Sequence, residues 1–189
     1  PAETIKNNIE IIENLLNLAK EKMTKIVIFS TSEVYGKSKK FPFNEDDDIV
    51  LGPSKIARWS YAASKLVDEF LGLAFHNQHG LPVIIVRLFN TVGPRQVGHY
   101  GMVIPRFVEQ AMTNSPITVF GDGKQSRCFC NVEDTIEALV RLTEKEECIG
   151  EVFNIGSSNE ISIEELANLV KKITNSSSDI EFIPYQEAY

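Results

Sequence analysis

The stretch that decides the fold is KIVIFSTSEVYG, residues 25–36. It opens with a continuous apolar run, residues 26–29, which is typical of a strand buried on both faces of a parallel sheet. Hydroxyl and carboxylate side chains follow at once, and the stretch ends at Gly36. We therefore predict a buried strand whose carboxyl end carries polar residues.

The segments around this strand alternate between helix and strand patterns. Apolar residues at helical spacing predict a helix over residues 3–21, polar residues 37–57 predict a loop, and residues 58–78 predict another helix. LPVIIVRL, residues 81–88, predicts a second buried strand. This alternation predicts an α/β fold with parallel strands, in which ligands bind at the carboxyl ends of the strands.

The second half of the chain is more mixed in its patterns. Helices are predicted at residues 102–113 and 131–144, and strands at residues 116–120, 151–156 and 180–185. Ser162 and Glu165 form an S-x-x-E capping box for a last helix that ends near Ile173. Glycines and a proline cluster over residues 93–102, which indicates a boundary between residues 1–95 and residues 96–189.

Composition narrows the class of partners. The chain has 189 residues and a formal net charge of −7, which argues against nucleic acid or an anionic membrane as the main partner. The apolar runs are too short to span a bilayer, and no signal peptide is recognised. Three cysteines, Cys128, Cys130 and Cys148, without a disulfide or metal-site spacing, indicate a reducing, cytoplasmic compartment and no metal site; the first two are expected in one strand.

Tyr61 and Lys65 lie four positions apart in the predicted helix 58–78, and therefore on one helical face. An ammonium close to a phenol favours the phenolate, which can act as a base. The alternative is a surface pair without function, because this spacing also arises by chance. Thr31, Ser32 and Glu33 favour the functional interpretation, since they end the strand that precedes the helix and would converge with Tyr61 in a parallel sheet.

Five motifs in order carry a family resemblance: STSEVYG, YAASK, VRLFNTVGPRQ, PITVFGDGKQSRCFCNVED and EVFNIGSS. Together they resemble the extended short-chain dehydrogenase/reductases, and more narrowly the nucleotide-sugar epimerases, dehydratases and decarboxylases. The resemblance covers essentially the whole chain. It implies that residues 1–95 form the later half of a doubly wound, Rossmann-like parallel sheet. Residues 96–189 would form mainly a small mixed α/β substrate lobe, with some segments returning to the sheet.

The resemblance also implies a cofactor, a substrate and a role for individual residues. The cofactor would be NAD, the substrate a nucleotide-diphosphate sugar with UDP as the expected nucleotide, and the assembly a homodimer. Tyr61 matches the catalytic base, Lys65 its partner and Thr31 the catalytic hydroxyl, with Ser32 and Glu33 beside it. The expected cofactor contacts are Asn8, Phe29, Ser30, Thr31, Tyr61, Lys65, Leu88 and Asn90. The expected substrate contacts are Glu33, Asn90, Arg95, Val103, Phe120 and Arg127.

Ser32 and Glu33 bear on what the 4-keto sugar of this family becomes. The resembling 4,6-dehydratases carry Asp-Glu here, and Ser32 replaces the aspartate. Simple 4-epimerases usually lack the glutamate, whereas Ser-Glu resembles the UDP-glucuronate decarboxylases and some 4-epimerases. A UDP-glucuronate decarboxylase-like and a UDP-glucose 4-epimerase-like reaction therefore both stay open, with 4,6-dehydration as a further alternative.

One family motif is not found in this sequence. The GxxGxxG turn, which holds the cofactor pyrophosphate at a helix N-terminus, is absent. We therefore expect the sequence to be a fragment that is inactive by itself. Two non-enzymatic alternatives remain, a nucleotide-binding relative without activity and a half-domain that pairs with another chain. The intact set Thr31, Tyr61 and Lys65 counts against the first of these.

Overall fold

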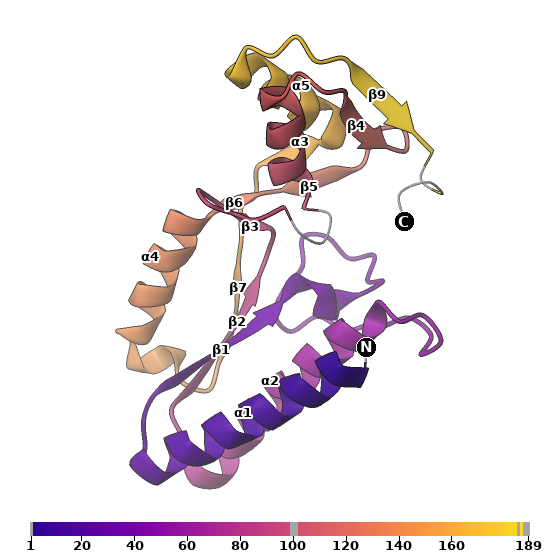
Figure 1. Ribbon diagram of the computed structural model, residues 1–189. Coiled ribbons are helices and arrows are strands. Elements are labelled where there is room, and N and C mark those ends of the chain that lie inside the picture. The colour runs from indigo at the N-terminus through magenta and orange to yellow at the C-terminus, as the bar shows by residue number, and fades with distance from the viewer. Residues whose placement is uncertain (1, 99–101, 185, 187–189) are drawn as a thin grey trace. The chain divides into compact units, whose positions relative to one another are not determined.

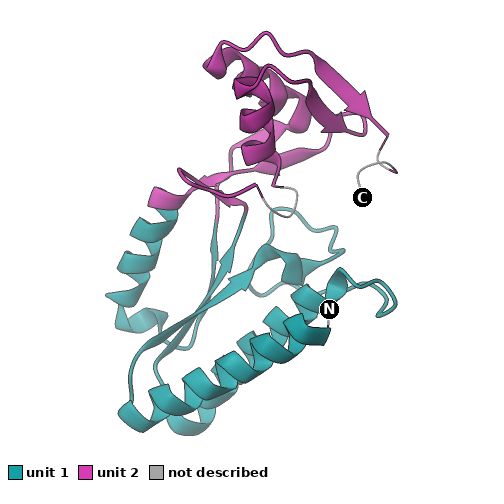
Figure 2. Cartoon of the chain, viewed as in Figure 1, with its two compact units in different colours: residues 1–89, 134–155 teal, residues 90–133, 156–189 magenta. Residues whose placement is uncertain are grey.

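The computed structural model describes residues 2–98, 102–184 and 186 (Figure 1). The chain divides into two compact units (Figure 2). Unit 1 comprises residues 1–89 and 134–155, and unit 2 comprises residues 90–133 and 156–189. The sequence indicates a boundary between residues 95 and 96, whereas the compact units first divide at residue 89 and return residues 134–155 to unit 1.

Unit 1 is built on a three-stranded parallel sheet with the order β1-β2-β7. The strands are β1 (Ile26–Thr31), β2 (Val83–Leu88) and β7 (Val152–Ile155). Phe29 of β1 pairs with Val86 of β2, which in turn pairs with Phe153 of β7. The predicted α/β class with parallel strands is therefore confirmed.

Helices cover both faces of this sheet (Figure 1). Helices α1 (Ala2–Lys22) and α2 (Trp59–His79) pack on one face, where Ile28, Val83 and Ile85 are buried among them. Helix α4 (Val132–Thr143) packs on the other face with Ile84 and Val86. Successive residues of β2 thus point to opposite faces, as a strand requires. All four β2 side chains from Val83 to Val86 are fully buried, and each contributes roughly 1.5–3 kcal/mol.

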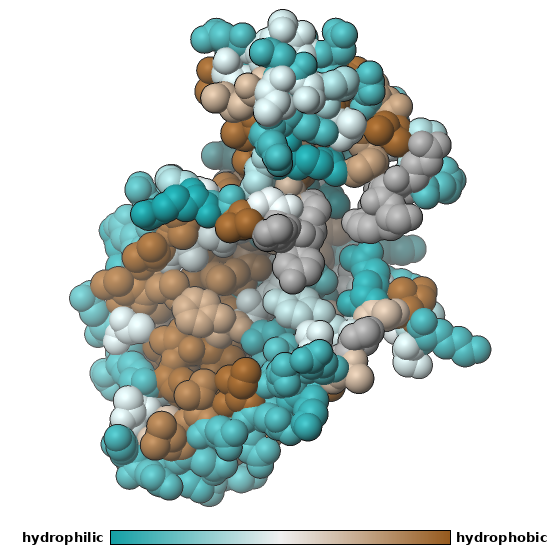
Figure 3. All heavy atoms as spheres, viewed as in Figure 1, coloured by the Kyte–Doolittle hydropathy of each residue, from teal (hydrophilic) through white to brown (hydrophobic). Residues whose placement is uncertain are grey.

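Beyond the core, unit 1 leaves apolar surface uncovered. Figure 3 shows hydrophobic residues gathered on the face of this unit that lies between α1 and α4. Phe29 of β1 is 48% exposed, and Ile136 and Val140 of α4 are both more than half exposed. The short 3₁₀ helix η2 (Glu146–Cys148) follows α4 and leads into β7.

The turn after β1 is a 3₁₀ helix, η1 (Ser32–Tyr35), with Thr31 as its N-cap. Gly36 ends it with φ 59°, a positive value that favours glycine. The backbone of Val50 approaches Gly36 so closely that a Cβ would collide with it. The Gly36 position therefore both ends η1 and lets the following loop lie against it.

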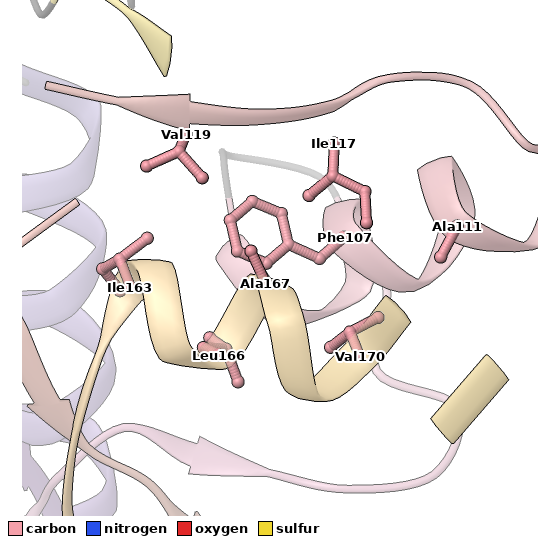
Figure 4. Packing of buried hydrophobic residues seen from close by; sticks show 8 residues of the cluster. All are labelled: Phe107, Ala111, Ile117, Val119, Ile163, Leu166, Ala167 and Val170. Atoms are coloured by element: carbon pink, nitrogen blue, oxygen red, sulfur yellow. The ribbon is translucent and has the colours of Figure 1, made fainter. Parts of the chain in front are cut away.

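Unit 2 is a smaller mixed α/β unit with its own core. Helices α3 (Val103–Met112) and α5 (Ile163–Thr174) pack beside the parallel strands β4 (Ile117–Phe120) and β9 (Ile180–Ile183). Figure 4 shows Phe107 of α3 at the centre of this core, with side chains of α5 and β4 around it. The predicted capping box is confirmed, since Ser162 Oγ accepts from Glu165 N and the Glu165 carboxylate accepts from Ser162 N.

Two further strand pairs complete unit 2. Strands β5 (Ser126–Cys128) and β8 (Glu160–Ser162) are antiparallel, and β3 (Thr91–Val92) and β6 (Cys130–Asn131) are parallel. The prediction that Cys128 and Cys130 share one strand is wrong. The backbone breaks its pairing at Phe129, so Cys128 ends β5 while Cys130 begins β6 beside a different partner.

The three cysteines are free thiols. Within residues 2–98, 102–184 and 186, none of the helices has both the length and the apolar character needed to cross a membrane.

Candidate active site

The first turns of α2 carry the two residues that the sequence singles out. Tyr61 is 40% exposed, and the Lys65 side chain is 17% exposed. Lys65 Nζ lies 2.7 Å from Asp68 Oδ2, so the ammonium forms an ion pair one turn further along the helix. Beside the predicted pair of Tyr61 and Lys65, the helix thus carries a further charged group, the Asp68 carboxylate, which no sequence motif marks.

The electrostatic environment of Tyr61 differs from the expectation. Burial, followed by the negative charges of Glu33 and Asp68, raises the pKa of the Tyr61 phenol above its usual value. We expected Lys65 to favour the phenolate. The physical reason for the difference is first the burial of Tyr61 and then the negative charges of Glu33 and Asp68, while the Lys65 ammonium is paired with Asp68.

The residues at the carboxyl end of β1 lie where the sequence placed them. Thr31 is the last residue of β1, and its Oγ1 accepts a hydrogen bond of 3.3 Å from Glu33 N. Ser32 and Glu33 begin η1, and the Glu33 charge acts on Tyr61. The fold of unit 1 thus lets the charge of Glu33 in η1 act on Tyr61 in α2, although the two residues are far apart in the sequence.

Asn8 of α1 anchors the start of α2. Its Nδ2 donates to Ser64 Oγ at 2.9 Å, and Ser64 Oγ donates to the Tyr61 carbonyl at 2.9 Å. This predicted cofactor contact therefore has a structural partner in unit 1. Of the other predicted cofactor contacts, Phe29 is half-exposed on β1, whereas Leu88 packs against the core on the α4 side.

A buried polar network joins α2 to the sheet. Arg87 of β2 forms an ion pair with Glu69 of α2, with Nη2 and Oε2 2.8 Å apart. Arg87 Nη1 donates to Tyr35 Oη at 2.8 Å, and Ser30 Oγ donates to Glu69. The hydroxyl of Ser30, a predicted cofactor contact, is therefore engaged inside the unit. Burial opposes the charge of Arg87, but Glu69 and then Tyr35 outweigh it, so the pKa of Arg87 is raised.

The same network holds the loop that follows η1. Tyr35 Oη donates to Asn154 Oδ1 at 2.8 Å, and the Tyr35 ring stacks on Phe43 with a centroid distance of 4.4 Å. Asn154 N donates to Glu45 Oε1 at 2.7 Å. Loop residues 43 and 45 are thus attached to the carboxyl ends of β2 and β7, which are the ligand-binding ends in parallel sheets.

Unit 2 contains a pocket of about 290 Å³. Four of the predicted substrate contacts line it, namely Asn90, Val103, Phe120 and Arg127. Arg95 does not line this pocket; it is exposed and has φ 66°. Four positions that lie far apart in the sequence thus line the same pocket.

Sequence reasoning missed four polar residues of this pocket: Thr91, Gln96, Arg106 and Gln125. The Arg106 guanidinium lies 4.3 Å from the Phe120 ring centroid, and Arg106 Nη2 donates to the Thr118 carbonyl at 3.1 Å. Gln125 Nε2 donates to the Phe120 carbonyl at 2.9 Å. No local motif marks Arg106, whereas Gln125 lies inside the quoted stretch PITVFGDGKQSRCFCNVED, two residues before Arg127. The pocket combines an aromatic ring with two arginines, which suits a planar, negatively charged ligand.

Across the described residues, no group of three or more His, Cys, Asp or Glu side chains is arranged to hold a metal ion. Unit 1 offers phenol, hydroxyl, ammonium and carboxylate groups, and unit 2 offers a pocket lined by two arginines.

Comparison with known proteins places this arrangement in a family. Residues 1–156 match the model of the NAD dependent epimerase/dehydratase family. A UDP-N-acetyl-alpha-D-glucosaminuronate decarboxylase of Bacillus cytotoxicus is 45% identical over 188 residues, 99% of this chain and 58% of that protein. UDP-glucuronic acid decarboxylase 1 of Arabidopsis thaliana is 40% identical over 97% of this chain and 42% of its own length.

A solved structure shows the same relationship. The UDP-glucuronic acid 4-epimerase of Bacillus cereus, in complex with UDP-glucuronic acid and NAD, superposes with a TM-score of 0.82 at 33% identity. It covers 94% of this chain and 54% of the epimerase chain. This chain therefore spans about half the length of the relatives it matches. With more than half of its residues matched by the family model, the chain belongs to the NAD dependent epimerase/dehydratase family.

Proposed function

We propose that the protein containing this chain is an NAD-dependent enzyme that converts a UDP-linked sugar through a 4-keto intermediate. One observation carries the proposal. Tyr61 and Lys65 lie on α2, and Tyr61 is acted on by the charge of Glu33. Glu33 lies in η1, directly after β1 ends at Thr31. The related proteins that act on UDP-linked sugars support the choice of substrate class.

The groups present in unit 1 fit the nicotinamide and ribose part of NAD. Tyr61 is partly exposed, and the Lys65 ammonium and the Thr31 hydroxyl are the donors that a ribose needs. When bound, NAD accepts and returns the hydride that creates and removes the sugar ketone. Lys65, Tyr61 and Thr31 would hold this part of the cofactor.

Tyr61 supplies the acid–base chemistry in this proposal. As a phenolate it accepts the proton of the sugar 4-hydroxyl while hydride leaves C4, and Thr31 Oγ1 orients or relays that proton. Because burial, Glu33 and Asp68 raise the pKa of Tyr61, the phenolate needs added positive charge to form near neutral pH. The ketone at C4 is β to a carboxylate carried on C5, which makes loss of carbon dioxide easy.

Unit 2 supplies substrate binding in this proposal. Arg127 suits the diphosphate, because a guanidinium makes two charge-assisted hydrogen bonds to phosphate oxygens. Phe120 offers an aromatic surface for the base, and Arg106 lies over the same ring. Asn90, which also lines the pocket, is held in place by a hydrogen bond of 3.0 Å from its Nδ2 to the Cys128 carbonyl.

Decarboxylation of a UDP-hexuronate is the outcome we propose. Ser32 replaces the elimination acid of the dehydratases, and Glu33 is present. The two curated relatives named above are decarboxylases of UDP-linked uronic acids. A 4-epimerase reaction is the second candidate, favoured by the structural likeness to a UDP-glucuronic acid 4-epimerase.

Product analysis with the full-length protein tests both candidates. The protein is incubated with NAD and one of three substrates: UDP-glucuronate, UDP-N-acetylglucosaminuronate or UDP-glucose. The masses of the products are then measured by mass spectrometry. Loss of carbon dioxide supports the first candidate, and a product of unchanged mass with altered stereochemistry supports the second. Loss of water from UDP-glucose would contradict both.

Tyr61→Phe tests the role of the base in the full-length protein. Turnover should fall about a thousandfold, the size typical of a lost general base, while nucleotide-sugar affinity changes little. Calorimetric titration of the same variant with UDP is the control, because retained binding shows that the variant is folded. Unchanged turnover would refute the assignment of Tyr61.

Assembly and location complete the proposal. We propose a homodimer through α1 and α2, supported by exposed apolar residues on both helices: Ile11, Leu15, Leu18, Val67 and Phe70. A purely monomeric sedimentation profile of the full-length protein would contradict it.

We also propose a cytoplasmic location, which the free cysteines support.

A further inference from the structure

Helix α2 carries two adjacent buried carboxylates, Asp68 and Glu69, which are 2% and 3% exposed. They serve different cations. Glu69 holds Arg87 of the sheet, whereas Asp68 holds Lys65 of its own helix, with Nζ and Oδ2 2.7 Å apart. The carboxylate whose charge acts on the candidate base is therefore paired with the cation that should assist that base.

The Asp68 carboxylate is only half satisfied. Its Oδ1 is buried and has no hydrogen-bond partner among the described residues. A buried carboxylate with one empty oxygen is costly unless a cation compensates it. The 2.7 Å contact with Lys65 is that compensation, so the position of the Lys65 ammonium is fixed by a strong local interaction.

We propose that Asp68 is a positioning residue for the Tyr61–Lys65 pair, which fixes where the Lys65 ammonium lies and thereby sets the pH range in which Tyr61 acts as a base. Asp68 does not touch the reacting atoms in this proposal; it acts through Lys65 and through its own charge. The proposal concerns the enzyme's pH dependence and therefore rests on the proposed function, but the state of the Tyr61 phenol can be measured without turnover.

Charged groups reach α2 from several elements, and at its start Lys37 and Arg58 lie over the Trp59 ring, 5.8 and 4.9 Å from its centroid. From η1, Glu33 acts on Tyr61 in the same direction as Asp68. From the sheet, Arg87 of β2 is held by Glu69, which also accepts from Ser30 of β1. From α1, Asn8 is neutral and bonds to Ser64, and Lys20 lies over the distant Phe75 ring.

Removal of the Asp68 charge has two consequences of the same sign. One negative charge that disfavours the phenolate disappears, and the Lys65 ammonium is released to approach the phenol. Both lower the pKa of Tyr61. Because the base works as the phenolate, the acidic limb of the pH–rate profile should move to lower pH. A residue with only a structural role would lower activity without moving that limb.

The first experiment titrates Tyr61 directly in the full-length protein. Tyrosine is labelled with ¹³C at Cζ, and the Tyr61 resonance is assigned by its absence in Tyr61→Phe. In Asp68→Asn, the titration midpoint of Tyr61 should fall by about one pH unit relative to the natural protein. A midpoint that stays in place overturns the proposal, whatever the enzyme turns out to catalyse.

The second experiment measures kcat/KM against pH. In Asp68→Asn the acidic limb should move to lower pH by about the same amount, and the plateau should fall about tenfold because Lys65 is no longer held in place. Asp68→Glu, which keeps the charge, should restore the original limb. A limb that does not move in Asp68→Asn overturns the proposal. If neither the natural protein nor any variant turns over UDP sugars, the proposed function fails while the titration still decides on Asp68.

Glu69→Gln is the matched control, because it neutralises the adjacent carboxylate of the same helix, which is also in a buried ion pair. It should lower stability and leave the Tyr61 midpoint in place, since Glu69 is not among the groups that act on Tyr61. An equal shift in this control would mean that any negative charge in α2 has the same effect, and would overturn a specific role for Asp68. If Asp68→Asn does not fold, Asp68→Ser removes the charge with a smaller side chain and should shift the midpoint in the same direction.

Discussion

The interiors of the two units differ in kind. Unit 2 has an apolar core of residues such as Phe107, Ile117 and Ala167 (Figure 4). Two of its arginines, Arg106 and Arg127, line a pocket. Unit 1 has apolar clusters on both faces of its sheet, but it also encloses two ion pairs, Lys65–Asp68 and Arg87–Glu69. Buried ion pairs are weak evidence for stability, because desolvation offsets their attraction. The difference indicates that unit 1 uses its buried charges to fix the positions of α2 and its side chains, whereas unit 2 relies on packing.

The largest expected effect lies in the core of unit 2. Phe107→Ala removes a fully buried ring at the centre of its cluster and should lower the free energy of unfolding by about 4 kcal/mol. Hydrogen exchange resolved by peptide should place the loss in residues 102–133 and 156–184. Equal loss of protection in β1 and β2 would mean that the two units unfold together, which would weaken the comparison.

Breaking the Arg87–Glu69 pair should have a slightly smaller effect, and in unit 1. Glu69→Gln leaves the Arg87 charge buried without its partner, which should cost about 3 kcal/mol in chemical denaturation. Replacing both members by apolar residues, Glu69→Leu with Arg87→Met, should cost much less than the single change. A double variant at least as unstable as Glu69→Gln alone would show that the pair stabilises unit 1 outright, contrary to the positioning role, and single effects that simply add would show that the two side chains are not coupled.

The smallest expected effect is at the start of α5. Ser162→Ala removes the hydroxyl that caps the helix and should cost about 1 kcal/mol. Hydrogen bonds from Ser162 N and Oγ also lower the pKa of Glu165 below its usual value. A lowered folded-state pKa contributes stability above the unfolded value, and that contribution is lost as pH falls through the folded value.

The difference in stability between Ser162→Ala and the natural chain should therefore shrink as the solution is acidified through the titration of Glu165. Thermal melts at several pH values measure it. Ser162→Thr, which keeps a hydroxyl at the N-cap, is the control and should retain most of the stability. A difference that grows at low pH would contradict this account of the cap.

Patterns that are local in sequence predicted most of the fold. Apolar residues at helical spacing located α1, continuous apolar runs located β1 and β2, and the S-x-x-E pattern located the start of α5. The strand pairings within unit 2 were not predicted, because β5 and β8 are short and meet across a long separation in sequence. The prediction of one strand for Cys128 and Cys130 failed because no local signal in the sequence marks the break at Phe129.

The candidate site was predictable where a motif marks a residue and unpredictable where tertiary structure decides its partner. YAASK and STSEVYG singled out Tyr61, Lys65 and Thr31 as candidates. Their sequence does not reveal which of the carboxylates Asp68 and Glu69 pairs with Lys65, because that depends on where β2 places Arg87. Arg106 was missed because its contact with Phe120 exists only after α3 packs beside β4.

The way the chain passes between its units has a consequence for biosynthesis. Strand β7 pairs with β2 in the sheet of unit 1, yet the ribosome makes it only after residues 90–133, which belong to unit 2. Until then α4 does not cover the face of β2 that carries Ile84 and Val86. The edge of β2 that pairs with β7 is also open. The nascent protein therefore exposes an open strand edge and apolar surface for part of its synthesis, which is the state that chaperones recognise.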